Sequence, residues 1–250
     1  MEKINCRLII EGKNSACKNM AIDRAMLFSY EEVKIPTLRF YQWELPTLSF
    51  GFFQKVPEHL IKICKKNNIA LVRRPTGGKA VLHDDEITYS IVAPYYLFSK
   101  ERDILQVYNS IAKIFLHAFK SMNLNVELSE CKTTDESSMF CFSEPSYYEI
   151  TFNGKKLIGN AQRYNRDIFL QHGSLPISRN LDLINELFGE GHKNKWTSLE
   201  ECLGYRPEIM LVQEKIINAF IDIFNFKFET TSYYQIEKDK AAEYEAGMNI

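Results

Sequence analysis

The chain has 250 residues, of which 31 are Lys or Arg and 32 are Asp or Glu, so its formal net charge is −1. This length suffices for one large domain or two small ones with a substantial apolar core. The near-zero charge argues against a general nucleic-acid-binding surface and against a polybasic membrane patch. No apolar run approaches the ~20 residues that a membrane-spanning helix needs.

The N-terminus and the cysteines indicate a cytoplasmic protein. Residues 1–6 lack the basic-then-apolar pattern of a signal peptide. The six cysteines are scattered and form no Cys-x-x-Cys pair, so in a reducing compartment we expect free thiols rather than disulfides or a zinc site. Each cysteine is then either a packed core residue or a chemically active thiol.

The N-terminal part of the chain is predicted to alternate strands and helices. The expected strands are 6–11, 37–43 and 47–53, and the expected helices are 19–30 and 58–66. Glu44-Leu45-Pro46 between the second and third strands suits a hairpin. Gly51 lies in an aromatic-rich strand, where a glycine often marks a close backbone approach or a bulge.

An apolar run at 69–72 leads into the stretch Arg73-Arg74-Pro75-Thr76-Gly77-Gly78-Lys79-Ala80-Val81-Leu82-His83-Asp84-Asp85. Side chains alternate along a strand, so one arginine can face a site while the other braces the loop. The glycines let backbone N–H groups approach a ligand. Guanidinium plus exposed amides suits a carboxylate, a phosphate or a polarised acyl oxygen. The alternative is a hairpin turn with solvated charges. His83 and Asp84 are expected to fix the loop through hydrogen bonds.

The second half of the chain begins with a strand at 87–93 and the clearest helix, 103–122, whose apolar residues repeat at three- and four-residue steps. A polar loop is expected at 129–139, and Asn153-Gly154 predicts a tight turn between strands. The other expected strands are 125–128, 147–152, 156–164, 167–176 and 227–229, and the other helices are 182–188, 210–224 and 237–245. The simplest fold class is α/β (α+β), as one domain of residues 1–250 in which 208–250 is a helical C-terminal portion.

Three motifs that could meet at one site, namely the loop 73–85, the segment of Cys141 and the strand of Lys156, resemble those of the lipoate–protein ligase, octanoyltransferase and biotin ligase superfamily. The stretch from Arg73 to Asp84 resembles its signature loop, and Lys156-Leu157-Ile158-Gly159-Asn160-Ala161-Gln162 resembles a strand whose lysine contacts the activated acyl carbonyl. Gln171-His172-Gly173-Ser174 resembles a segment that borders the acyl pocket. The resemblance covers roughly residues 4–225. It implies a mixed, largely antiparallel sheet with helices on one side and an acyl tunnel along it.

Cys141 is the residue that distinguishes the octanoyltransferase branch of this superfamily from the ligase branch. The segment 141–149 resembles the one that carries the nucleophile in octanoyltransferases acting between acyl carrier protein and a lipoyl domain. The expected catalytic residues are therefore Cys141 and Lys156; the alternative for Lys156 is a snorkelling strand-end lysine. His172 is a weaker candidate for proton transfer than for a structural role. The expected substrate-binding residues are Arg73, Arg74, Thr76, Gly77, Gly78, His83, Gly159, Asn160, Gly173 and Ser174.

The reaction that the resemblance implies moves an octanoyl or lipoyl group from octanoyl-acyl carrier protein, through a Cys141 acyl-enzyme, to a lysine of a lipoyl domain or glycine-cleavage carrier protein. No cofactor, nucleic acid or membrane is expected in that reaction. One alternative is an ATP-dependent lipoate–protein ligase, which would use ATP and Mg and in which Cys141 only lines the pocket. Another is a non-catalytic acyl- or carrier-binding homologue. The sequence leaves open the carrier, the choice of octanoate or lipoate, and the oligomeric state.

Overall fold

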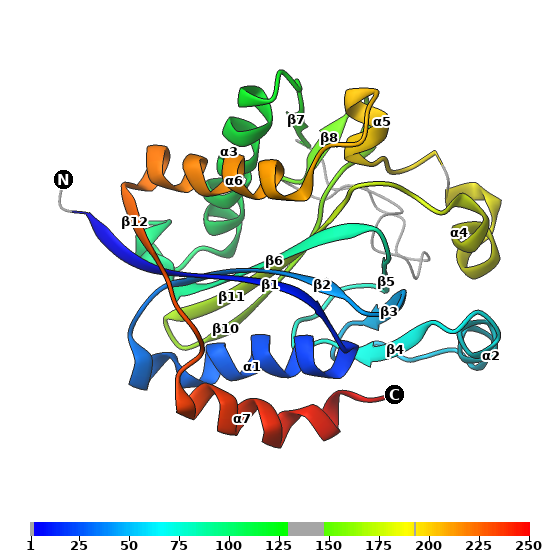
Figure 1. The fold of residues 1–250 in the computed structure, drawn as a ribbon, viewed down its shortest axis with the longest axis horizontal. Helices are drawn as coiled ribbons and strands as arrows, with labels where there is room; N and C mark the ends of the chain where they lie inside the picture. Colours follow the sequence, from blue (N-terminus) through cyan, green and yellow to red (C-terminus); the bar gives the residue numbers. More distant parts are fainter. Residues whose placement is uncertain (1–2, 130–147, 193) are drawn as a thin grey trace.

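The computed structural model describes residues 3–129, 148–192 and 194–250. Its centre is a six-stranded sheet in the order β10-β11-β6-β2-β1-β12 (Figure 1). Antiparallel pairs join β10, β11, β6 and β2, and parallel pairs join β2, β1 and β12. The sheet is therefore mixed and largely antiparallel, as expected. The strands are β1 (Ile4–Asn14), β2 (Thr37–Trp43), β6 (Glu86–Pro94), β10 (Gly159–Asn165), β11 (Ile168–Pro176) and β12 (Phe226–Thr230).

Helices cover both faces of this sheet. Figure 1 shows α1 (Ala16–Val33) and α7 (Gln235–Glu245) on one face and α3 (Ile104–Ser121) and α6 (Ile209–Phe224) on the other. The expectation that helices lie on one side was therefore wrong. Every residue of the central strands β6 and β11 is buried, and strands buried on both faces need a covering layer on each.

A second, three-stranded sheet holds β3 (Thr47–Phe50), β4 (Ala70–Arg73) and β5 (Val81–His83) in the order β4-β3-β5. The expected hairpin between the strands at 37–43 and 47–53 was wrong, because β2 and β3 belong to different sheets. Both edges of β2 are already occupied, by β1 and β6. Residues 44–46 instead carry the chain from one sheet to the other.

A third sheet contains the short strands β7 (Glu127–Leu128), β8 (Ile150–Phe152) and β9 (Lys155–Lys156). Asn153 and Gly154 both have positive φ between β8 and β9, so the Asn-Gly turn is confirmed. The strand expected over 156–164 is two strands, β9 and β10, separated by two fully buried residues, Leu157 and Ile158.

The largest apolar cluster lies between the six-stranded sheet and the helices α3 and α6. On α3 the buried stripe includes Val107, Ile111, Phe115 and Phe119, and burying each such side chain is worth about 1.5–3 kcal/mol. The remaining helices are α2 (Glu58–Lys66), α4 (Leu181–Phe188) and α5 (Leu199–Leu203). In the described ranges no helix combines the length and the apolar character that crossing a membrane requires.

Candidate active site

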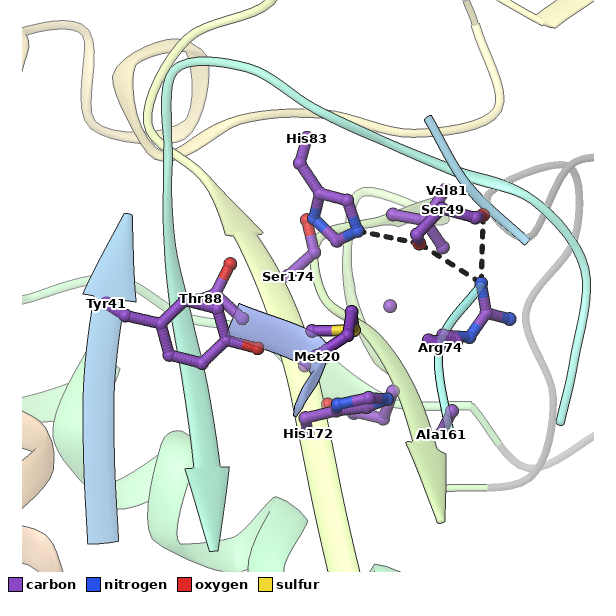
Figure 2. Close-up of a pocket in the computed structure, with 13 residues that line it drawn as sticks. Met20, Tyr41, Ser49, Arg74, Val81, His83, Thr88, Ala161, His172 and Ser174 are labelled. Carbon is purple, nitrogen blue, oxygen red and sulfur yellow. Dashed lines mark hydrogen bonds between the residues drawn. The ribbon is translucent and has the colours of Figure 1, made fainter. Parts of the chain in front are cut away.

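A cavity lies where the second sheet meets β6, β10, β11 and α1 (Figure 2). Its empty space, counting the mouth open to solvent, is about 340 Å³. The residues that line it are Met20, Tyr41, Ser49, Arg74, Val81, His83, Thr88, Gly159, Asn160, Ala161, His172, Gly173 and Ser174. The lining therefore joins the signature loop to two motifs more than 70 residues further along the chain.

The register of two strands explains why the later motifs meet. In the antiparallel pair β10–β11, Gly159 lies opposite Ser174 and Asn160 lies opposite Gly173. These four residues, which the sequence analysis named as substrate-binding, all line the cavity. Gly173 has to be a glycine, since a Cβ there would lie 2.2 Å from Asn160 Oδ1 and 2.4 Å from Cε1 of buried Tyr89.

The two adjacent arginines, Arg73 and Arg74, bind different parts of the backbone. Arg74 is buried and lines the cavity; it donates to the carbonyls of Ser49, Gly77 and Lys79 at 3.0, 2.8 and 2.6 Å. Arg73 does not line the cavity and donates to the carbonyls of Gly51, Phe52 and Gln54. Both guanidiniums therefore hold loop backbone in place, and only Arg74 does so beside the cavity.

Gly51 makes the close backbone approach that the sequence predicted. A Cβ on Gly51 would lie 2.0 Å from the carbonyl oxygen of Gly78, so the turn after β3 packs directly on the Gly77-Gly78 segment. Gly78 has φ +93°, a conformation that glycine adopts without strain. Both Gly77 and Gly78 are exposed and neither lines the cavity.

His83 is fixed on one wall of the cavity between a carboxylate and a hydroxyl. Its Nδ1 lies 2.9 Å from Glu86 Oε1, so it donates there, and its Nε2 lies 2.8 Å from Ser49 Oγ. The ring also stacks on Trp43 with centroids 4.2 Å apart. Figure 2 shows Ser49 between His83 and Arg74, whose Nη1 donates to Ser49 Oγ. His83 thus fixes the loop through hydrogen bonds, as expected, whereas Asp84 is exposed.

His172 is held by a second arrangement of the same kind. Its Nδ1 donates to Asp23 Oδ2 at 2.9 Å, and its Nε2 lies 2.7 Å from Oγ1 of buried Thr76. Burial lowers the pKa of His172, helped by the positive charge of Arg74, although Asp23 opposes the shift. A neutral imidazole can accept from the Thr76 hydroxyl, so Thr76 contributes by joining the loop to β11 and does not itself line the cavity.

The carboxylate of Asp23 is the centre of a buried polar network behind the cavity. It accepts from Arg39 Nη1 at 2.9 Å and from the Tyr41 hydroxyl at 2.9 Å. Burial opposes its ionisation, but the hydrogen bond from His172 and the Arg39 charge leave its pKa below the ordinary value. Arg39 also pairs with Glu11, so every charge in this network has an opposite charge beside it.

Comparison with known proteins assigns the family. The model of the lipoyl protein ligase A/B catalytic domain matches residues 15–221. This chain belongs to that family. Octanoyltransferase LipM of Oceanobacillus iheyensis is 38% identical over 227 residues, which cover 86% of this chain and 83% of that protein. Octanoyltransferase LipM of Moorella thermoacetica is 35% identical over 256 residues, covering 96% and 94%.

The likeness extends to the fold of solved structures. A bi-partite lipoate protein ligase from Thermoplasma acidophilum, solved in a study of that ligase and its E2 lipoyl domain, has a TM-score of 0.81, with 20% identity, and the match covers 97% of this chain and 92% of that one. At this level of sequence identity the match establishes a similar fold only. The resemblance inferred from the sequence is thereby confirmed for both family and fold.

Lys156, the family motif's lysine, is deeply buried. It lies on β9 with 1% of its surface exposed, and its Nζ lies 2.6 Å from Oε1 of Glu149. The alternative of a lysine snorkelling to solvent is therefore wrong. Lys156 is not among the residues that line the cavity; it precedes the lining residue Gly159 by three positions. Its pairing with Glu149 accounts for a buried ammonium.

The four described cysteines are protonated thiols away from the cavity. Burial raises the pKa of Cys6, Cys17, Cys64 and Cys202, to about 11 for Cys64 and Cys202, and none of the four lines the cavity. Thiolate character is what makes a cysteine nucleophilic. Cys141, the expected nucleophile, lies outside the described residues, and its role stays a prediction.

Sequence reasoning missed three charged residues that organise this family site: Asp23, Arg39 and Glu86. Glu86 accepts from His83 and from Trp43, Thr88 and Ser174. One signal was available, because a carboxylate that begins a largely apolar strand is costly unless partners surround it. Among the described residues, no group of three or more His, Cys, Asp or Glu side chains could hold a metal ion.

Proposed function

We propose that this chain transfers an octanoyl group to a lysine of a protein during protein lipoylation. The observation that carries the proposal is the cavity in which the signature loop and the two later motifs of the family meet. The relatives described above are named octanoyltransferases. The exposed lining of the cavity is largely apolar, although eight of its thirteen residues carry polar side chains, which suits a short acyl chain with a polar end.

The proposed donor is octanoyl-acyl carrier protein, and Cys141 is the proposed nucleophile. The Cys141 thiolate attacks the thioester carbonyl, the new S–C bond forms, and the carrier leaves as a thiol after taking up a proton. Lys156 and the backbone amides of Gly77 and Gly78 are proposed to stabilise the oxyanion. A buried ammonium supports this role, since a preorganised charge acts more strongly away from water.

The proposed acceptor is a lysine of a lipoyl domain or of a glycine-cleavage carrier protein. Its neutral amine attacks the acyl-enzyme, an amide forms, and the Cys141 thiol is released. An amide is more stable than a thioester, so this step proceeds without ATP, metal or other cofactor. A free thiol needs a reducing compartment, and we accordingly propose a cytoplasmic location.

The contacts of Arg74 favour transfer over ATP-dependent ligation. A ligase mechanism would place this guanidinium near an adenylate phosphate. In the structure its nitrogens donate to two loop carbonyls, to the Ser49 carbonyl on β3 and to Ser49 Oγ, so they are engaged in holding the loop on β3. Binding a phosphate would require these hydrogen bonds to be exchanged.

Intact-mass spectrometry tests the proposal. Enzyme mixed with octanoyl-acyl carrier protein, without acceptor or ATP, should gain one octanoyl group that hydroxylamine removes and that maps to Cys141. Adding a lipoyl domain should discharge it. Cys141→Ala should lose both adduct and transfer, whereas Cys202→Ala, the matched control, should keep them.

Three results would count against this mechanism: no adduct under donor excess, an adduct on Cys131, or an active Cys141→Ala enzyme. Free octanoate or lipoate supplied with ATP and magnesium provides the ligase comparison. Modification of the lipoyl domain under those conditions only, with release of pyrophosphate, would establish the ligase alternative.

A further inference from the structure

Aromatic rings and guanidinium groups alternate in a row beside the cavity, which we call the cation–ring row. The Arg24 guanidinium lies 4.1 Å from the Tyr244 ring centroid and 5.9 Å from that of Phe28. The Arg163 guanidinium lies 5.3 Å from the centroid of Phe28 and 5.1 Å from that of Phe52. Four separate segments of the chain thus converge to hold two arginines around one phenylalanine.

The row continues directly from the cavity along two elements. On α1, Met20 lines the cavity, and Arg24 follows at i+4, one turn or about 6 Å further along the same helix face. On β10, Ala161 lines the cavity, and Arg163 follows at i+2, about 7 Å further along the same sheet face. Both guanidiniums therefore lie one step beyond the acyl cavity.

Within the described residues, no carboxylate forms a salt bridge with either arginine. Arg24 Nε is buried and has no hydrogen-bond partner there. Arg163 donates one bond, from Nη1 to the carbonyl of Pro75 at 2.8 Å. Partial burial, with the nearby Arg24 charge adding to it, lowers the pKa of Arg163.

This arrangement has the chemistry of an oxyanion site. Rings face both guanidiniums, and the N–H groups other than Arg163 Nη1 have no hydrogen-bond partner among the described residues. A planar two-point contact with a phosphate or carboxylate would use these groups. Two like charges held around one ring repel each other, and a bound anion would relieve that repulsion. A covering of rings also weakens competition from water for the bound anion.

We propose that Arg24 and Arg163 bind the phosphodiester of the donor's 4′-phosphopantetheine arm. This inference rests on the proposed function, in which the donor is a thioester on a carrier protein. Such a donor has an apolar acyl chain, a flexible neutral linker and one phosphodiester. The cavity binds the acyl chain, and the cation–ring row beside it binds the phosphodiester. Phe53, which is 90% exposed next to Phe52, extends an apolar surface along the same side.

Two minimal octanoyl donors test the proposal: octanoyl-pantetheine, and octanoyl-4′-phosphopantetheine, which adds the phosphate. The wild-type enzyme should prefer the phosphorylated donor in kcat/KM by about 10-fold or more, the usual range for a charged hydrogen bond. Arg24→Gln and Arg163→Gln should each bring this ratio toward one, and Arg24→Gln should do so without changing kcat/KM for octanoyl-pantetheine. The control is Arg166→Gln, an exposed arginine in the turn after β10, which should keep the wild-type ratio.

Equal ratios for the wild type and both variants would overturn the proposal. An equal decrease in kcat/KM for both donors in Arg163→Gln would also overturn it, because such a decrease reflects only the lost hydrogen bond to the Pro75 carbonyl. Arg163→Lys, which keeps the charge without the planar fork, should retain part of the preference.

A binding measurement separates this inference from the proposed function. Calorimetry with 4′-phosphopantetheine and pantetheine needs no catalysis, so an affinity ratio that both Gln variants abolish supports the site even if no octanoyl transfer occurs. If the wild type transfers octanoyl groups but binds the two compounds equally, the proposed function stands and the site is wrong. If the variants weaken ATP binding and leave phosphopantetheine binding unchanged, the row is a nucleotide site and the proposal is also overturned.

Discussion

Replacing Gly51 by Ala should disrupt the signature loop, because the new Cβ would lie 2.0 Å from the Gly78 carbonyl oxygen. Ordinary van der Waals contact begins at 3.4 Å, so the two segments must separate by about 1.4 Å. Arg74 donates to the carbonyls of Gly77 and Lys79, on either side of Gly78. A displacement of that size breaks at least one of these hydrogen bonds.

The cost of Gly51→Ala combines two terms. Overpacking typically costs about 1–3 kcal/mol, and a lost hydrogen bond to a charged group about 1.5–3 kcal/mol. The free energy of unfolding should therefore fall by about 2.5–6 kcal/mol. For a chain of this size that corresponds to a Tm decrease of roughly 5–24 °C. Octanoyl transfer should fall by about 100-fold, since misplacing a binding group by 1 Å costs that much.

Thermal unfolding followed by circular dichroism, together with the transfer assay, measures both effects. Gly12→Ala is the matched control, because Gly12 is a strand glycine and a Cβ added there would have no heavy atom within 4 Å. It should change Tm by less than about 3 °C. A Gly51→Ala enzyme with the Tm and activity of Gly12→Ala would refute the reasoning.

Two further predictions concern buried ionisable groups. Burial holds the pKa of His172 below its ordinary value of 6.5, so its contribution to stability is complete above pH 6.5 and is lost as pH falls through the folded pKa. The free energy of unfolding, measured with urea, should therefore fall between pH 7 and pH 5, and it should fall less in His172→Gln. An equal fall in the wild type and the variant would contradict the assignment. Lys156→Ala removes the buried ammonium that lies 2.6 Å from the Glu149 carboxylate, so the free energy of unfolding should fall by about 3–5 kcal/mol. The variant should transfer octanoyl groups about 10²–10³-fold more slowly. Lys155→Ala, its neighbour on β9, is the control, and equal behaviour of the two variants would show that Lys156 has neither role.

Local patterns in the sequence were enough to predict most elements and the family of the site. The helix at 58–66 has the predicted bounds, and the apolar stripe of 103–122 gives α3 within one residue at each end. The Asn153-Gly154 turn and the close approach at Gly51 were also correct. In each case the signal lies within a few residues of the feature and depends on steric rules that hold in any fold.

The pairing of strands could not be read in the same way. Residues 37–43 and 47–53 have the alternation and the short connection of a hairpin, and the pattern is correct for two strands. Which strand each one pairs with depends on β1, β6, β4 and β5, and β6 begins more than 30 residues later. Sheet membership is a property of the whole chain, and short-range patterns leave it open.

The charged residues behind the cavity were missed for a related reason. Asp23 on a helix and Arg39 on a strand each look like one solvated charge when only neighbours in sequence are considered. In the fold both are fully buried, and each is stable there because the other lies 2.9 Å away. His172, which lies 149 residues after Asp23 in the chain, donates to the same carboxylate. The Asp23 carboxylate therefore links α1, β2 and β11. The same network that fixes the imidazole against Thr76 therefore also fixes three elements of the fold. The geometry of the cavity thus depends on two residues, Asp23 and Arg39, that do not line it.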